Sequence, residues 1–226
     1  MAATDNILKL KQLLQERHPH IPVGWREAPA PQEAVASGVP GLDLLLEGGF
    51  PRGEFTELVG HGDGSGTAQV IHALLRRVAR DGQFMALVDG ADSFDLHAEE
   101  QDTLAHLLWV RCHNVVEAFK AADLLLRDRN FPLVIIDLKL NPASQLRKVS
   151  ASTWYRWSRL MDHNQTTVVV VTPFSIVSGA NCRVELDSRL GIETLSQSPA
   201  EVATRLRYTL QRAAAVTNAA QFRQTG

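Results

Sequence analysis

Apolar segments that alternate with amphipathic segments constrain the fold of this chain more than any other feature. Short segments bounded by turns predict strands at residues 54–59, 84–89, 107–110, 131–137, 166–172 and 182–186. Longer segments with apolar residues at helical spacing predict helices at residues 67–80, 115–128, 152–163 and 199–215. The central strands are apolar throughout, which is typical of a parallel sheet buried on both faces, whereas 182–186 alternates like an edge strand. We therefore expect an α/β fold, with a mostly parallel central sheet flanked by helices on both faces.

Charge and cysteine content exclude several classes of protein. The 226 residues include 23 Lys and Arg against 25 Asp and Glu, a net charge of −2, so the overall charge does not favour nucleic acid. Cys112 and Cys182 lie far apart, which predicts buried thiols and neither a disulfide framework nor a metal site. No apolar run approaches the ~20 residues of a membrane helix, and the N-terminal residues lack the apolar region of a signal peptide. We expect a cytoplasmic protein with no membrane segment.

A glycine-rich loop joins the first expected strand to the first long helix, in the sequence GHGDGSGT. Phosphate-binding loops of the pattern G-x-x-x-x-G-K-[ST] stand at this place, and their lysine reaches the β- and γ-phosphates. Here Gly66 stands in the lysine position and Ser65 in that of the preceding glycine. The candidate loop residues are Gly60, Gly62, Gly64, Ser65, Gly66 and Thr67. We favour a loop that serves only as a tight turn, and anion binding by its backbone amides is the alternative.

The two ends of the chain differ from its centre in composition. Residues 1–18 are expected to form an amphipathic helix, whose apolar face includes Leu8, Leu10, Leu13 and Leu14. A Pro-rich linker is expected at 19–35, the core domain at 36–216 and a flexible tail at 217–226. The four leucines are candidates for binding a partner, and the alternative is that the helix packs on its own domain.

Four segments, in the same order, resemble the core of the RecA/RadA/KaiC superfamily. SGVPGLDLLLEGGFPRGEFTELVG is similar to its lead-in and first strand, FMALVDGADSFDL to its second strand, PLVIIDL to its Walker B strand, and TTVVVVTPF to the strand before its second DNA-binding loop. The resemblance covers about residues 36 to 190 and implies a RecA-like P-loop fold. It places Asp137 at the magnesium-facing end of Walker B, and the alternative is that Asp137 only ends a buried strand.

The same resemblance indicates which catalytic groups are missing. The second strand of the superfamily carries Asp-x-Glu, whose glutamate activates water, but here Asp89 is followed by Ala91 in the glutamate position. Phosphoryl transfer depends on positioning and electrostatic stabilisation, so losing both the lysine and the glutamate should remove most of the catalysis. Asp92 is a poor substitute, because its side chain would point to the other face of a continued strand. We expect no enzymatic activity, no catalytic residue and no cofactor or metal, with a weak ATPase as the alternative.

A longer segment, RNFPLVIIDLKL followed by LRKVSASTWYRWSRLMDHNQTTVVVVTP, resembles the ImuA family. These RecA-related proteins are accessory factors of SOS-induced translesion DNA synthesis, and they overlap in sequence with SulA-like inhibitors of cell division. The resemblance implies a role in mutagenesis beside an ImuB-like Y-family polymerase homologue, an error-prone replicative-type polymerase and RecA, with self-association as a further expectation. A residual nucleotide-binding ATPase and a SulA-like division inhibitor are the alternatives.

Basic and aromatic residues are interleaved after the Walker B-like strand, where the superfamily has its first DNA-binding loop. The basic residues are Arg147, Lys148, Arg156 and Arg159, and the aromatic residues are Trp154, Tyr155 and Trp157. Such residues can contact phosphates and stack on unpaired bases, but the spacing of the tryptophans also fits a buried helix face. The second DNA-loop position, residues 175–180, is too short to wrap a strand. We therefore expect weak, sequence-independent binding of single-stranded DNA at most.

Overall fold

The structure is a computed structural model that describes residues 34–128, 130–161 and 165–212. The expected N-terminal helix, with Leu8, Leu10, Leu13 and Leu14, lies outside these residues, as do the tail and most of the linker. Near the start of the described residues, Val35 pairs with Phe50 in an isolated antiparallel bridge. The described residues thus fall almost entirely within the expected core domain.

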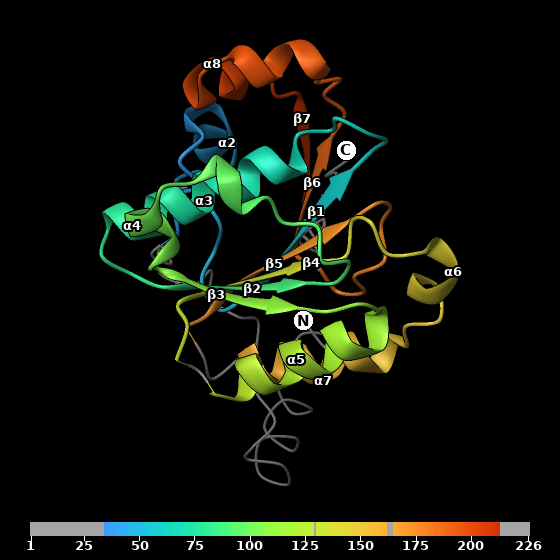
Figure 1. The fold of residues 1–226 in the computed structure, drawn as a ribbon. Coiled ribbons are helices and arrows are strands. Elements are labelled where there is room, and N and C mark those ends of the chain that lie inside the picture. The colour runs from blue at the N-terminus through green and yellow to red at the C-terminus, as the bar shows by residue number, and fades with distance from the viewer. Residues whose placement is uncertain (1–33, 129, 162–164, 213–226) are drawn as a thin grey trace, which may run out of the picture. The chain divides into compact units, whose positions relative to one another are not determined.

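A seven-stranded sheet runs through the described residues in the order β3-β2-β4-β5-β1-β6-β7 (Figure 1). The strands are β1 Phe55–Gly60, β2 Met85–Asp89, β3 Leu107–Arg111, β4 Leu133–Asp137, β5 Thr167–Thr172, β6 Cys182–Leu186 and β7 Tyr208–Arg212. All neighbouring pairs are parallel except β6 and β7, which are antiparallel. The expected α/β fold with a mostly parallel sheet is confirmed.

Helices cover both faces of the sheet (Figure 1). On one face lie α2 Pro40–Leu45, α3 Thr67–Arg80, α4 Gln101–Leu104 and α8 Pro199–Thr204. On the other lie α5 Val115–Asp128, α6 Ala143–Leu146 and α7 Ala151–Met161. Two short 3₁₀ helices, η1 Leu96–Ala98 and η2 Ile192–Ser196, lie in the connections. Every residue of β1, β2 and β5 is buried, because these strands have covered faces and neighbours on both sides.

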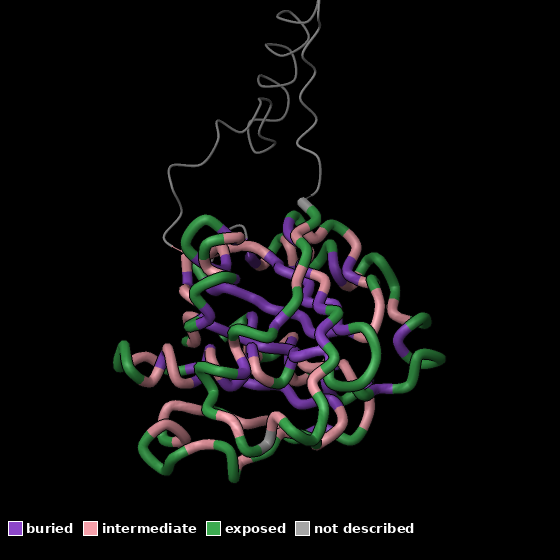
Figure 2. The backbone as a smooth tube through the Cα atoms, turned by 90° about the horizontal axis from the view of Figure 1, so that it is seen from above, coloured by how far each residue is buried: buried purple, intermediate pink, exposed green. Residues whose placement is uncertain are grey.

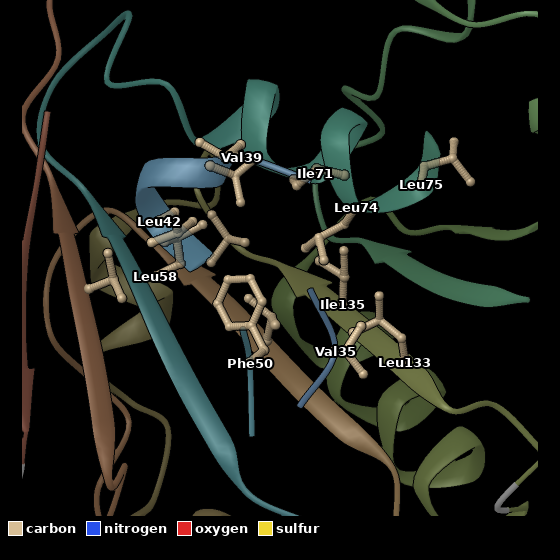
Figure 3. Close-up of a cluster of buried hydrophobic side chains, with 14 of the residues drawn as sticks. Val35, Val39, Leu42, Phe50, Leu58, Ile71, Leu74, Leu75, Leu133 and Ile135 are labelled. Carbon is tan, nitrogen blue, oxygen red and sulfur yellow. The ribbon is translucent and has the colours of Figure 1, made fainter. Parts of the chain in front are cut away.

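Each face of the sheet has its own apolar core. Figure 3 shows the first, in which Leu42 and Phe50 pack with Leu58 of β1, Leu74 of α3 and Ile135 of β4. Figure 2 shows that buried backbone runs through the centre of the molecule, while the outer turns are exposed. Burial of a large apolar side chain contributes about 1.5–3 kcal/mol, so these two layers supply most of the stabilisation of the sheet.

The second core is rich in aromatic rings. Trp154 and Trp157 of α7 are almost fully buried, with 1% and 0% of their surface exposed. Phe119 of α5 stacks on Trp157 at 5.0 Å between ring centroids, and Phe55 of β1 stacks on the same ring at 6.4 Å. The expectation that the tryptophans are core residues is therefore confirmed.

The C-terminal part differs from the sequence prediction in two ways. The helix expected at 199–215 is wrong: α8 ends at Thr204, and the chain returns as strand β7 beside β6. A Ser198–Glu201 capping box starts the short helix, and Leu206 then packs into the core rather than on a continuing helix face. The bounds of 182–186 are confirmed, but it is not an edge strand, because β7 covers its free side.

Candidate functional site

The glycine-rich loop lies at the carboxyl end of the parallel strands, the edge at which open α/β sheets bind their ligands. It connects β1, which ends at Gly60, to α3, which begins at Thr67. The same edge holds Asp89 of β2 and Asp137 of β4, which are partners in the register of these neighbouring strands. The topology thus brings together the loop and both retained acidic residues that the sequence singled out.

The backbone at Gly66 disfavours the side chain that a phosphate-binding loop would carry there. Gly66 caps α3 with a φ of 96°, in the left-handed region that side chains disfavour. A Cβ added at this position would lie 2.3 Å from Cδ2 of Leu206, so the end of this leucine side chain would have to shift. The loop therefore lacks the lysine, and a lysine there would require both a strained backbone and a movement of Leu206.

The segment that follows β6 also packs against the loop, near Leu206. The backbone N–H of Leu190 donates to the carbonyl oxygen of Gly64 at 2.9 Å, and a Cβ added at Gly64 would lie 2.2 Å from the Leu190 carbonyl oxygen. Ser188 is buried, and its hydroxyl accepts a hydrogen bond from the backbone N–H of Arg207 at 2.8 Å. The loop is consequently packed against the β6–β7 region of the same chain.

Lys139 places an ammonium group at the loop from the turn that follows β4. Its Nζ donates to the carbonyl oxygens of Gly60 and of Gly62, the latter at 3.0 Å. Burial lowers the pKa of Lys139, while Asp63 and Asp137 act in the opposite direction. The sequence analysis missed this residue, and the only available signal was a lysine two positions after the acidic end of an apolar strand.

Asp137 is held in an environment that disfavours its charge. One carboxylate oxygen accepts a hydrogen bond from the backbone N–H of Lys139 at 2.9 Å. Burial raises the pKa of Asp137 to about 6, and the negative charge of Asp89 adds to the rise. A raised carboxyl pKa in a concave site is characteristic of functional positions, but it equally marks a buried acid that lacks a compensating cation.

Asp89 organises the turn that follows β2. Its carboxylate accepts hydrogen bonds from the backbone N–H groups of Ala91, Ser93 and Phe94 and from Nε1 of Trp109. Its side chain is buried, so these bonds satisfy it from within the protein. Asp89 therefore has a structural role here.

Asp92 does not take the place of the glutamate that is missing at position 91. The strand ends at Asp89, so Asp92 does not continue it, as the argument from strand alternation had assumed. Instead Asp92 adopts a φ of 52° and pairs with Arg111 through two bonds of 2.6 and 2.7 Å. The hydrogen bond from Arg111 lowers the pKa of Asp92, which makes this carboxylate a weak base.

The cavity that remains at the loop is small. It has a volume of about 240 Å³ and is lined by the loop residues together with Phe94, Asp137, Lys139 and Leu140. Sites for small molecules and cofactors usually enclose about 300–1,000 Å³. Because Gly66 brings no lysine to this cavity, the residues present lack the loop lysine with which a phosphate-binding loop holds a nucleoside triphosphate.

The four candidate DNA-contacting residues differ in their surroundings. The guanidinium of Arg147 lies over the ring of Phe174, at 5.3 Å from its centroid, and Arg156 pairs with Asp123 at 2.9 Å. Lys148 and Arg156 line one cavity together, whereas Arg159 is exposed on α7 outside it. Their role in DNA binding stays a prediction.

The second DNA-loop position is fixed to the centre of the sheet by a buried carboxylate. Glu57 of β1 accepts hydrogen bonds from the backbone N–H groups of Ile176 and Val177 and from Nε of Arg183. Glu57 is fully buried, so release of this segment would leave its charge without those partners. The segment 175–180 is thus a short, anchored connection.

Comparison with known proteins gives partial similarity to one group of proteins. No protein-family model matches the chain. It is 32% identical to protein RecA of Porphyromonas gingivalis over 106 residues, which are 46% of this chain and 31% of that protein. It is 33% identical over 115 residues to protein RecA of Nocardioides sp., covering 49% of this chain and 32% of the relative. The protein RecA of Francisella tularensis subsp. novicida is 28% identical over 124 residues, covering 51% and 33%.

The chain is a RecA-related protein. The similarity supports membership of the RecA-like superfamily, and the seven-stranded, mostly parallel sheet is consistent with a RecA-like core. The chain spans about a third of the length of the relatives that it matches. In the part of the chain that the structure describes, no helix combines the length and apolarity needed to cross a membrane, and no cluster of three or more His, Cys, Asp or Glu side chains is placed to hold a metal ion.

Proposed function

We propose that this protein is a non-catalytic RecA-like accessory factor that acts by binding other proteins in SOS-induced translesion DNA synthesis. The observation that carries the proposal is the backbone at Gly66, where a left-handed φ and the nearby end of the Leu206 side chain disfavour the lysine of a phosphate-binding loop. The second requirement for hydrolysis, an acid that activates water, is absent at Ala91, and Asp92 is engaged by Arg111.

The expected loss of catalysis follows from the chemistry of phosphoryl transfer. Enzymes stabilise the charge on the transferred phosphoryl group by cations and aligned donors, and removing one such donor from an active site costs about 2.7–4 kcal/mol in the activation free energy. Losing both the loop lysine and the glutamate therefore favours a role in which the fold serves as a scaffold. The resemblance to the ImuA family in residues 129–173 supports the translesion role, with an ImuB-like polymerase homologue and RecA as partners.

Measurement of ATP binding and hydrolysis tests the non-catalytic part of the proposal. Purified full-length protein is titrated with magnesium ATP in a calorimeter and assayed for phosphate release with and without single-stranded DNA, with a bacterial RecA assayed in parallel. We expect no turnover above background. Turnover at a rate typical of RecA-like enzymes, abolished by Asp137→Ala, would contradict the proposal.

Co-purification tests the choice of partners. We expect the protein to retain an ImuB-like polymerase homologue and RecA, and not the GTPase of the division machinery. Retention of the division GTPase alone would favour a SulA-like inhibitor instead.

A second function, binding of a phosphate group at the loop without turnover, is favoured by Lys139. This residue brings an ammonium group to the loop carbonyls of Gly60 and Gly62, close to where the absent lysine would act. Titration of a fluorescent ATP analogue tests it. Saturable binding that is lost in Lys139→Met and kept in Lys139→Arg would support this function, and equal behaviour of both variants would exclude it.

A further inference from the structure

A groove lies over α5 and α7 and the connection around α6, on the sheet face opposite to α3. It has a volume of about 960 Å³. We call it the α5–α7 groove. Its lining includes Val116, Phe119, Lys120, Leu124, Lys148 and Val149.

An exposed apolar stripe runs along the α5 side of this groove. Val116 and Leu124 are 62% and 69% exposed, and with Lys120 they are spaced four residues apart on one face of the helix. Phe119 and Val149 continue the apolar lining and are only partly buried. A cluster of exposed apolar residues beside a large cavity is typical of a surface that binds another protein.

The charges around the groove are predominantly positive. Asp123, the acidic residue of its lining, is fully engaged: Arg127 and Arg156 pair with it at 2.8 and 2.9 Å, and Nε1 of Trp157 donates to it at 3.0 Å. Lys120 and Lys148 form no ion pair with any described residue. An occupant with acidic groups at its flanks would therefore meet two unpaired ammonium groups.

We propose that the α5–α7 groove binds an acidic amphipathic helix of a partner protein. This inference deepens the proposed accessory function and rests on it. The groove is bordered by helices and their connections and presents apolar side chains at helical spacing, which suits apolar anchors of a helix at i, i+3 and i+4. The partner's acidic residues would lie beside Lys120 and Lys148.

Single-stranded DNA fits the same groove less well. Bases bind single-strand-binding proteins by stacking on exposed aromatic rings, but the ring of Phe119 already stacks on Trp157 and lies edge-on against Trp154. The groove also exposes aliphatic side chains between its two unpaired cations, and aliphatic groups gain little from contact with a phosphate backbone.

Binding of defined peptides to the full-length protein tests the proposal. The probes are two fluorescein-labelled helical peptides of about 18 residues with the same leucine stripe, one with glutamates on its flanks and the other with lysines at those positions. Fluorescence anisotropy is measured for both, and also for a labelled oligo-dT. We expect saturable binding of the acidic peptide, at least about tenfold tighter than that of the basic peptide.

Matched variants locate the contact. The double variant Val116→Ser and Leu124→Ser should weaken binding of the acidic peptide by at least about tenfold, and Lys120→Glu with Lys148→Glu should remove the preference for the acidic peptide. Leu44→Ser, at an exposed leucine of α2 on the other face of the sheet, and Arg159→Glu, on α7 outside the groove, should leave binding unchanged. Because all altered residues are exposed, we expect each variant to melt within a few degrees of the parent protein.

Three outcomes would overturn the proposal. The first is the absence of saturable binding to the acidic peptide, and the second is equal binding by the groove variants and the controls. The third is displacement of the peptide by oligo-dT, together with loss of oligo-dT binding in the double variant Lys120→Glu and Lys148→Glu. That third result would make the groove a nucleic-acid interface. These results can be told apart from those that test the proposed function. If the protein hydrolyses ATP and also binds the peptide, the proposed function fails and the groove proposal stands. If it neither hydrolyses ATP nor binds the peptide, only the groove proposal fails.

Discussion

The glycine-rich loop and the α5–α7 groove lie on different parts of the same sheet and differ in what occupies them. At the loop, Leu206, Leu190 and Lys139 from the protein's own chain fill or bind the positions around the backbone. At the groove, Val116 and Leu124 stay exposed and two lysines stay unpaired. The loop is packed against other segments of the same chain and keeps only a small cavity, whereas the larger, open groove lies on the helical layer of the opposite face.

This difference supports the proposed function, in which the fold keeps its architecture and the contacts with partners lie on another surface. The sheet and its two cores need apolar strands and helix faces, and these are all present. The loop needs a lysine only for chemistry, so under the proposed non-catalytic function its backbone can be built around glycine. Substitutions at and beside the loop test how closely it is packed, beginning with the largest expected effect.

Substitution of Gly66 should destabilise the protein most. Gly66→Lys combines a left-handed backbone, at about 1–3 kcal/mol, with overpacking against Leu206, at about 1–3 kcal/mol, so we expect a loss of roughly 3 kcal/mol in the free energy of unfolding. It should not restore ATP hydrolysis, because Ala91 remains. Urea unfolding and a phosphate-release assay measure the two effects.

Gly62 offers a matched control for that experiment. It has a φ of 68°, but a Cβ added there would meet nothing within 4 Å. Gly62→Lys should therefore show the backbone strain alone, about 1–2 kcal/mol. Equal losses for both variants, or tight ATP binding by Gly66→Lys, would mean that Leu206 does not close the loop and that the comparison with the groove fails.

Asp137→Asn should stabilise the protein at neutral pH. The folded-state pKa of Asp137 is about 6 against an ordinary value of 3.8, so the folded state holds this proton more tightly than the unfolded state does. The contribution to stability is therefore greatest below about pH 4, falls as the pH rises from about 4 to 6, and is fully lost above that range. Asparagine does not ionise and so removes this loss of stability at neutral pH, which is on the order of 2–3 kcal/mol. Its side-chain oxygen can still accept a hydrogen bond from the backbone N–H of Lys139.

The measurement is the difference in unfolding free energy between Asp137→Asn and the parent protein at several pH values. The difference should favour the variant near pH 7.5 and shrink toward zero near pH 4. Glu100→Gln, at an exposed residue, serves as the control and should show no such trend. A constant difference across this range would mean that burial does not raise the pKa of Asp137, and the loop end would then be more open to solvent than its packing indicates.

Lys139→Met should have the smallest effect of the three. It removes hydrogen bonds from a partly exposed ammonium to two loop carbonyls, which are worth roughly 1–2 kcal/mol. Hydrogen exchange of the loop amides between Gly60 and Thr67 should become faster, while Lys139→Arg keeps the charge and should lose less protection. Unchanged exchange in Lys139→Met would show that packing by Leu190 and Leu206 alone holds the loop.

Most of the fold could be predicted because it depends on local pattern. The helices 67–80 and 115–128 and the strand 182–186 have the predicted bounds, since their apolar residues repeat at the period of the element that buries them. The helix at 199–215 failed because Val202, Leu206 and Leu210 happen to be four residues apart, although Leu206 packs on a distant loop and Leu210 lies in a strand. The spacing of apolar residues along the sequence does not reveal such a long-range contact.

Only the residues that are missing from the site could be predicted from the sequence. The absent lysine and glutamate are visible in the sequence, because a known pattern fixes where they should stand. Lys139, Leu190 and Leu206 were missed, because their proximity to the loop depends on strand order and on the return of β7. The groove was missed for the same reason: Lys120 and Lys148 are separated by 28 residues in the sequence and meet only through the packing of α5 beside α7.

The contact between Gly66 and Leu206 also bears on the evolutionary history of such a chain. A lysine introduced at position 66 meets a filled space, and a smaller residue introduced first at position 206 leaves a cavity in the core. Either single step toward a loop that carries lysine therefore lowers stability. Under the proposed non-catalytic function, selection that acts on one substitution at a time meets a barrier in that direction, so substitutions should accumulate at exposed surfaces before the loop gains a lysine.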